Sequence, residues 1–145
     1  MIVRQLAVIL TPLLMAQAAP KQQLVPEGVH SLANGPETIC GVTAASALDF
    51  ERQVKASPQA KYNNETDRYL TYEGPVPLTL WAFAQPSNFA YPIATCVRVY
   101  EQNGQVFMDR KMRCDATREQ CDRAFLEFQE LDAKNRERIQ GRERG

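Results

Sequence analysis

The chain has 145 residues, in which 17 lysine and arginine residues balance 17 aspartate and glutamate residues. Such a balance gives no general attraction to nucleic acid or to an anionic membrane surface. The chain has one histidine and four cysteines without a C-x-x-C pair, so we expect no metal site, and no motif predicts a cofactor.

The first 18 residues have the pattern of a secretory signal peptide. Arg4 precedes an apolar run, which is interrupted by Thr11-Pro12 and ends in the small residues Ala16-Gln17-Ala18. We therefore expect a secreted protein, extracellular or in a bacterium periplasmic, whose mature chain begins near Ala19. No later segment is apolar enough to span a bilayer, so no membrane contact is expected. In an oxidising compartment the four cysteines are expected to form two disulfides.

Residues 19–37 predict an extended N-terminal arm, since three prolines and two glycines occur from Pro20 to Pro36 with little periodicity. The next segment predicts a helix with Thr43 as its N-cap and Pro58 as its stop signal. Four apolar residues of this helix are expected to face a sheet: Ala47, Leu48, Phe50 and Val54.

Two short strands are predicted after this helix. Asn63-Asn64 is expected to open a turn, and the aromatic and β-branched run from Arg68 to Tyr72 predicts the first strand. The alternating run from Leu78 to Phe83 predicts the second. Pro86 and Pro92 then bracket an irregular loop.

The segment from Cys96 to Cys114 predicts a β-hairpin. Its Asn103-Gly104 pair is the preferred sequence for a two-residue type I′ turn, because both central residues need a positive φ. In that register, residues whose numbers sum to 207 face one another, so the two cysteines point to opposite faces. The face expected to form the core carries Val97, Val99, Val106 and Met108. The other face carries Cys96, Arg98, Tyr100, Phe107 and Asp109.

The C-terminal segment predicts a second helix, with a capping box from Thr117 to Gln120. Its apolar stripe consists of Cys121, Ala124, Phe125, Phe128 and Leu131. Residues 132–145 are polar and are expected to form a charged tail with a fraying end. Separately, Asn64-Glu65-Thr66 is a glycosylation sequon, which makes Asn64 a candidate modification site if the source is eukaryotic.

Several short stretches of the chain have an order and spacing that a known family shares. They are Ile39-Cys40-Gly41, Lys61-Tyr62-Asn63-Asn64-Glu65, Trp81, Val97-Arg98-Val99-Tyr100 and Cys114. In this arrangement the chain from residue 38 to 114 resembles the small secreted fungal ribonucleases that cut after guanine, and the ribonuclease-like effectors of plant-pathogenic fungi. The resemblance implies an N-terminal helix packed on a twisted antiparallel sheet of about four strands. With the C-terminal helix predicted above, we expect an α+β domain over residues 38–131.

The chain differs from this family at the positions of the catalytic residues. The family cleaves RNA with a glutamate base, two histidines and an arginine on one face of the sheet. This chain has Gln59-Ala60 in place of one histidine, Leu80 in place of the glutamate, and no histidine from Val106 to Cys114. His30 lies outside the matched region. We therefore expect no catalytic residues and a ribonuclease-like protein without ribonuclease activity.

The resemblance also implies a disulfide between Cys40 and Cys114, which leaves Cys96 to pair with Cys121. This pairing would draw the C-terminal helix across the face where a ribonuclease keeps its cleft. The alternative, Cys40 with Cys96 and Cys114 with Cys121, is also sterically possible because a short turn separates the last two cysteines.

The function hypothesis is a secreted, inactive, monomeric ribonuclease-like effector that binds a host protein or RNA. The candidate binding residues lie in the matched stretch after the first helix and in the loop from Gln85 to Tyr91; they are Lys61, Tyr62, Asn63, Asn88 and Tyr91. One alternative is a periplasmic α+β binding, inhibitor or accessory protein of a bacterial envelope system. Another is an enzyme that uses Glu65, Glu73, or Asp109 beside Lys111.

Overall fold

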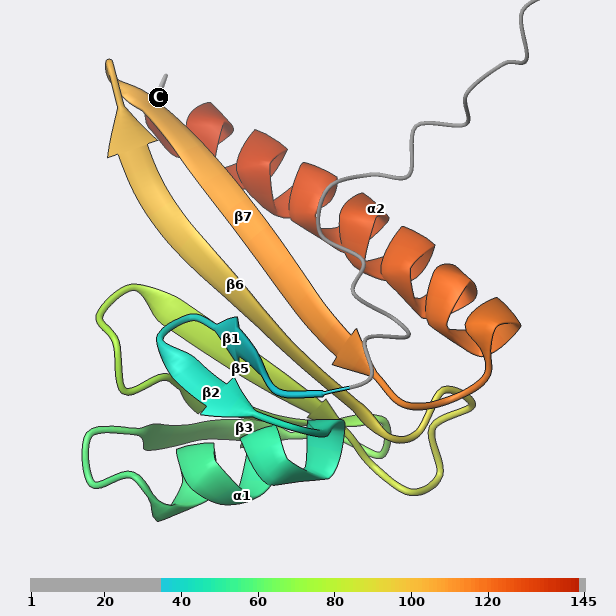
Figure 1. Ribbon diagram of the computed structural model, residues 1–145. Helices are drawn as coiled ribbons and strands as arrows, with labels where there is room; N and C mark the ends of the chain where they lie inside the picture. Colours follow the sequence, from blue (N-terminus) through green and yellow to red (C-terminus); the bar gives the residue numbers. More distant parts are fainter. Residues whose placement is uncertain (1–34, 144–145) are drawn as a thin grey trace, which may run out of the picture.

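The computed structural model describes residues 35–143, so the predicted signal peptide, most of the predicted arm and His30 lie outside the described residues. The elements are β1 (Glu37–Ile39), β2 (Val42–Ala44), α1 (Ala47–Ala56), β3 (Lys61–Glu65), β4 (Tyr69–Glu73), β5 (Thr79–Ala84), β6 (Ile93–Gln102), β7 (Gln105–Cys114) and α2 (Arg118–Glu143). The α+β class is as predicted. The main antiparallel sheet, however, has five strands in the order β3-β4-β5-β6-β7, and a separate β1–β2 hairpin precedes α1 (Figure 1).

The β6–β7 hairpin has the predicted turn and register. Asn103 and Gly104 have φ values of 54° and 75°, and pairing runs without a bulge from Ile93 opposite Cys114 to Gln102 opposite Gln105. Because side chains alternate along a strand, Cys96 and Cys114 point to opposite faces, as predicted. The two faces are called here the α1 face and the α2 face, after the helix that covers each (Figure 1).

The α1 face carries the core beneath α1 and the β1–β2 hairpin. Its largest buried side chains are Ile39, Phe50, Val54, Trp81 and Phe83. Ala47, Phe50 and Val54 are buried as predicted, but Leu48 is exposed. The predicted N-cap is wrong: Thr43 lies in β2, and the hydroxyl of Ser46 accepts the N–H of Asp49 at 3.1 Å instead.

The expected disulfide pairing is wrong, and the alternative is observed. Cys40 is bonded to Cys96, and Cys114 to Cys121. The physical reason is the assignment of faces: α1 and the β1–β2 hairpin lie over Cys96, whereas Cys114 faces α2. The valines and Met108 expected beneath the first helix therefore lie on the α2 face. The two bonds are consistent with a secreted protein.

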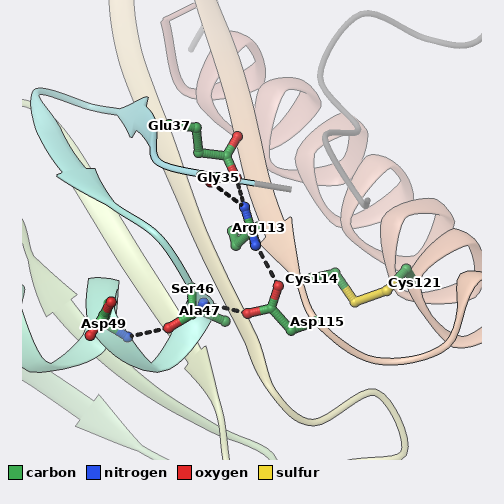
Figure 2. A network of polar contacts seen from close by, with 9 residues as sticks. All are labelled: Gly35, Glu37, Ser46, Ala47, Asp49, Arg113, Cys114, Asp115 and Cys121. Atoms are coloured by element: carbon green, nitrogen blue, oxygen red, sulfur yellow. Dashed lines mark hydrogen bonds and ion pairs between the residues drawn. A yellow bond between two sulfur atoms is a disulfide. The ribbon is translucent and has the colours of Figure 1, made fainter. Parts of the chain in front are cut away.

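A polar network joins the segments that the expected Cys40–Cys114 bond would have linked (Figure 2). Arg113 donates to the carbonyl of Gly35 at 3.1 Å and to Glu37 at 3.2 Å, and it also pairs with Asp115. The other oxygen of Asp115 accepts the N–H of Ala47 at 2.6 Å, at the start of α1. Burial acts to lower the pKa of Arg113, but the bonds to Asp115 and Glu37 outweigh it and raise the pKa. Charged hydrogen bonds thus tie β1 and α1 to the end of β7.

Helix α2 has the predicted capping box, in which Thr117 and Gln120 bond to each other's peptide N–H. Four of the five predicted stripe residues are buried: Cys121, Ala124, Phe125 and Phe128. The prediction for the fifth residue, Leu131, is wrong: its side chain is 45% exposed, and the neighbouring Asp132 is buried instead. The helix continues through the polar segment to Glu143, alongside β7 (Figure 1).

Candidate functional site

Three of the predicted binding residues lie together on β3, at the edge of the sheet. Lys61, Tyr62 and Asn63 are all exposed, as are Asn64 and Glu65. The turn predicted at Asn63-Asn64 is wrong, because both residues belong to the strand. The register of β3 against β4 shifts between Tyr62 and Asn64, which leaves Asn63 in a bulge. Asn64 keeps the surface position that modification requires.

The two predicted binding residues in the loop between β5 and β6, Asn88 and Tyr91, differ in their exposure to solvent. Tyr91 is partly exposed, but Asn88 is only 6% exposed and both ends of its amide are bonded within the protein. Its Nδ2 donates to the carbonyl of Arg68 at 3.2 Å, and its Oδ1 accepts the N–H of Ala90 at 3.0 Å. The loop lies next to Glu65, at the opposite end of β3 from Lys61. The predicted binding residues therefore do not form one continuous site.

The candidate acid and base residues are also dispersed. Glu65 accepts a bond from Gln85 at 2.7 Å, and Glu73 lies opposite Lys61 on β4. Asp109 and Lys111 lie on β7, at the other edge of the sheet. Within residues 35–143, no three histidine, cysteine, aspartate or glutamate side chains are grouped to hold a metal ion.

None of the helices in the described part of the chain is long and apolar enough to cross a membrane.

Side chains of α2 cover the part of the α2 face formed by β6, β7 and the adjoining ends of β4 and β5. Phe125 and Phe128 pack against the small and aliphatic residues Ala84, Ile93 and Met112. Phe128 also meets Tyr69 of β4 edge to face, with ring centroids 5.3 Å apart. The space over this part of the sheet is therefore occupied by apolar groups.

Farther along α2, an ion pair between Arg110 and Asp132 extends the contact between this helix and the sheet. Arg110 donates two hydrogen bonds of 2.7 Å to Asp132, and the side chains are only 10% and 11% exposed. Arg110 also donates to the hydroxyl of Thr95 at 3.1 Å and lies 4.5 Å from the ring centroid of Phe128. The positive charge on this face is thus neutralised and enclosed.

The outer half of the β6–β7 hairpin has an exposed aromatic surface on the α1 face. Tyr100 and Phe107 stack directly opposite each other, with centroids 5.4 Å apart and planes at 18°. The guanidinium of Arg98 lies 5.2 Å from the centroid of Tyr100. Tyr100 is 37% exposed, and no described element lies in front of this end of the hairpin (Figure 1). Arginine and tyrosine are among the residue types enriched at the energetic centre of protein interfaces.

Leu78 lies beside this surface in an unusual conformation. Its φ is 60°, in the left-handed region that costs a non-glycine residue about 1–2 kcal/mol, and its side chain is 73% exposed. Its carbonyl accepts the N–H of Val99 at 3.0 Å. Sequence reasoning missed this residue, because alternation placed it inside a strand. Backbone strain of this kind is concentrated at functional surfaces.

No protein-family model, no curated protein and no solved structure matches the chain.

Proposed function

We propose that the protein is a secreted ribonuclease-like effector without ribonuclease activity, and that it acts by binding a host protein rather than RNA. The observation that carries this proposal is the packing of α2 over part of the sheet face opposite α1. In a ribonuclease-like domain that face would hold the substrate and the acid and base residues. Here it holds Phe125, Phe128 and a neutralised Arg110.

The surface properties favour a protein partner over a nucleic acid. RNA binding draws most of its affinity from cationic side chains that replace counterions along the phosphate backbone. This chain carries equal numbers of basic and acidic residues, and Arg110 is held by Asp132. The exposed Arg98 and Tyr100 instead are of the residue types that are enriched in protein interfaces.

The test is incubation of the purified protein with a fluorogenic single-stranded RNA that contains guanine. We expect no cleavage above the buffer rate, while a guanine-specific ribonuclease at equal concentration serves as the positive control. Fluorescence anisotropy with the same RNA should show no binding that weakens with added salt. Cleavage after guanine, or salt-dependent binding, would contradict the proposal.

A further inference from the structure

Strand β6 extends past its neighbour β5. The pairing of the two strands begins at Thr79 opposite Arg98, and one further bond joins Leu78 to Val99. β6 continues to Gln102, so the edge from Tyr100 to Gln102 has no neighbouring strand in the described part of the chain. This edge is called here the hairpin ledge.

The hairpin ledge has backbone groups that are available for pairing. Gln102 and Gln105 flank the two-residue turn and bond to each other, so alternation directs the peptide groups of Val99 and Glu101 away from β7. The N–H of Val99 already donates a hydrogen bond to the carbonyl of Leu78. The carbonyl of Val99 and both peptide groups of Glu101 remain without a partner among residues 35–143.

The side chains along the ledge alternate between the two faces. Tyr100 and Gln102 lie on the α1 face, next to the aromatic pair, and Glu101 lies on the α2 face. Glu101 is exposed and has no ion-pair partner in the described chain. The inner end of the ledge is bounded by the exposed Leu78.

A second copy of this chain does not suit the ledge. Two ledges related by a two-fold axis and paired through their free peptide groups would place Glu101 directly opposite the same residue of the other copy. Like charges at directly opposed positions of adjacent strands destabilise the pairing. The other unpaired edge that carries the predicted binding residues, β3, is protected by Lys61 and by the bulge at Asn63.

We propose that the hairpin ledge binds an extended segment of a partner protein, which adds a short strand beside β6 in line with β5. The segment carries a basic side chain opposite Glu101 and an apolar side chain on either side of it, one opposite Tyr100 and the other opposite Gln102. Main-chain bonds to Val99 and Glu101 supply the pairing, and the alternating side chains supply the selectivity. This inference depends on the proposed function only in that the partner is a protein.

The test is titration of the isotope-labelled full chain with two acetylated, amidated peptides, Thr-Val-Lys-Val-Thr and Thr-Val-Glu-Val-Thr, followed by amide chemical shifts. We expect the lysine peptide to shift the amides from Val99 to Gln102. It should bind about fivefold more tightly than the glutamate peptide, since opposed charge pairs differ by up to about 1 kcal/mol. The variant Glu101→Lys should reverse this preference.

Two further variants complete the test. Glu101→Pro removes the outward N–H without removing a bond to β7, so it should abolish the shifts. Glu65→Lys reverses the charge of an exposed carboxylate on β3 and should leave both affinities unchanged. Equal binding of the two peptides, shifts confined to β3, or no shift at millimolar peptide would overturn the inference. If the RNA stays uncleaved and the peptides do not bind, only the inference that the hairpin ledge binds an extended segment is contradicted. If the RNA is cleaved, the proposed function is contradicted.

Discussion

Arg110 and Asp132 face each other across the contact between β7 and α2, joined by two hydrogen bonds of 2.7 Å and shielded from solvent on both sides. The ring of Phe128 and the hydroxyl of Thr95 complete the surroundings of the guanidinium. The buried apolar stripe of α2 ends at Phe128. One turn later, the ion pair between Asp132 and Arg110 takes over the contact with the sheet and holds the second half of the helix on it.

Asp132→Ala should destabilise the protein by about 3–5 kcal/mol, because it leaves a buried guanidinium without its counter-charge. Chemical denaturation measures the free energy of unfolding. Glu130→Ala, which removes the exposed pair with Lys134, is the control and should leave the free energy of unfolding nearly unchanged. The double variant Arg110→Met with Asp132→Leu should recover most of the loss. A double variant as unstable as the single one would contradict the role assigned to the pair.

The two disulfides should contribute unequally. Cys40–Cys96 closes a separation of 56 residues and Cys114–Cys121 one of 7. Loop-closure entropy then assigns about 4 kcal/mol to the first bond and about 2.5 kcal/mol to the second. Replacement of each pair by serine, followed by denaturation, measures both values. Peptide mapping without reduction should recover these two pairs, and a peptide joining Cys40 to Cys114 would refute the described arrangement.

Leu78→Asn should raise the free energy of unfolding by about 1 kcal/mol. Asparagine tolerates the left-handed conformation better than leucine, and the exposed side chain loses little packing when replaced. Thermal and chemical unfolding provide the measurement. The control is Leu126→Asn, at a leucine of α2 that is 62% exposed, where the change should lower stability slightly through helix propensity. A loss of stability at position 78 would show that the leucine makes contacts that outweigh its strain.

The stability of the protein should fall at alkaline pH through Tyr69. Burial between β4 and α2 raises the pKa of this phenol above its ordinary value, because the phenolate is poorly solvated there. A group whose folded-state pKa is raised contributes fully below its unfolded pKa of about 10 and loses that contribution as pH rises through the folded value. Tyr69→Phe should therefore flatten the decline of stability above pH 10. An identical decline in both proteins would rule out this cause.

The features that could be predicted from sequence are those with local physical causes. The β6–β7 register follows from the positive φ values that Asn103-Gly104 adopts readily and from the two-residue period of a strand. The burial of Phe125 and Phe128 follows from helical spacing. The β1–β2 hairpin was missed, although Cys40 and Gly41 form its two-residue turn with φ values of 44° and 79°. Cysteine is not a residue expected in such a turn.

The candidate site was less predictable, because it depends on where strands end relative to one another. The exposed hairpin face was expected to be covered by the C-terminal helix, and the ledge exists only because β5 begins opposite Arg98 while β6 continues to Gln102. Asn88, predicted as a binding residue, is buried, and its amide group is bonded to the carbonyl of Arg68 and to the N–H of Ala90. Exposure and strand length are set by neighbours that a single sequence does not specify.

Local sequence thus established that two cysteines of one hairpin point to opposite sides of a sheet, since alternation and turn geometry involve only adjacent residues. Which helix covers each side, and therefore which thiols meet, depended on long-range packing. The free energy of burying Phe50 against Trp81 on one face and Phe128 against Met112 on the other is gained only when distant segments come together. Tertiary packing, rather than any local pattern, decided that Cys40 joins Cys96.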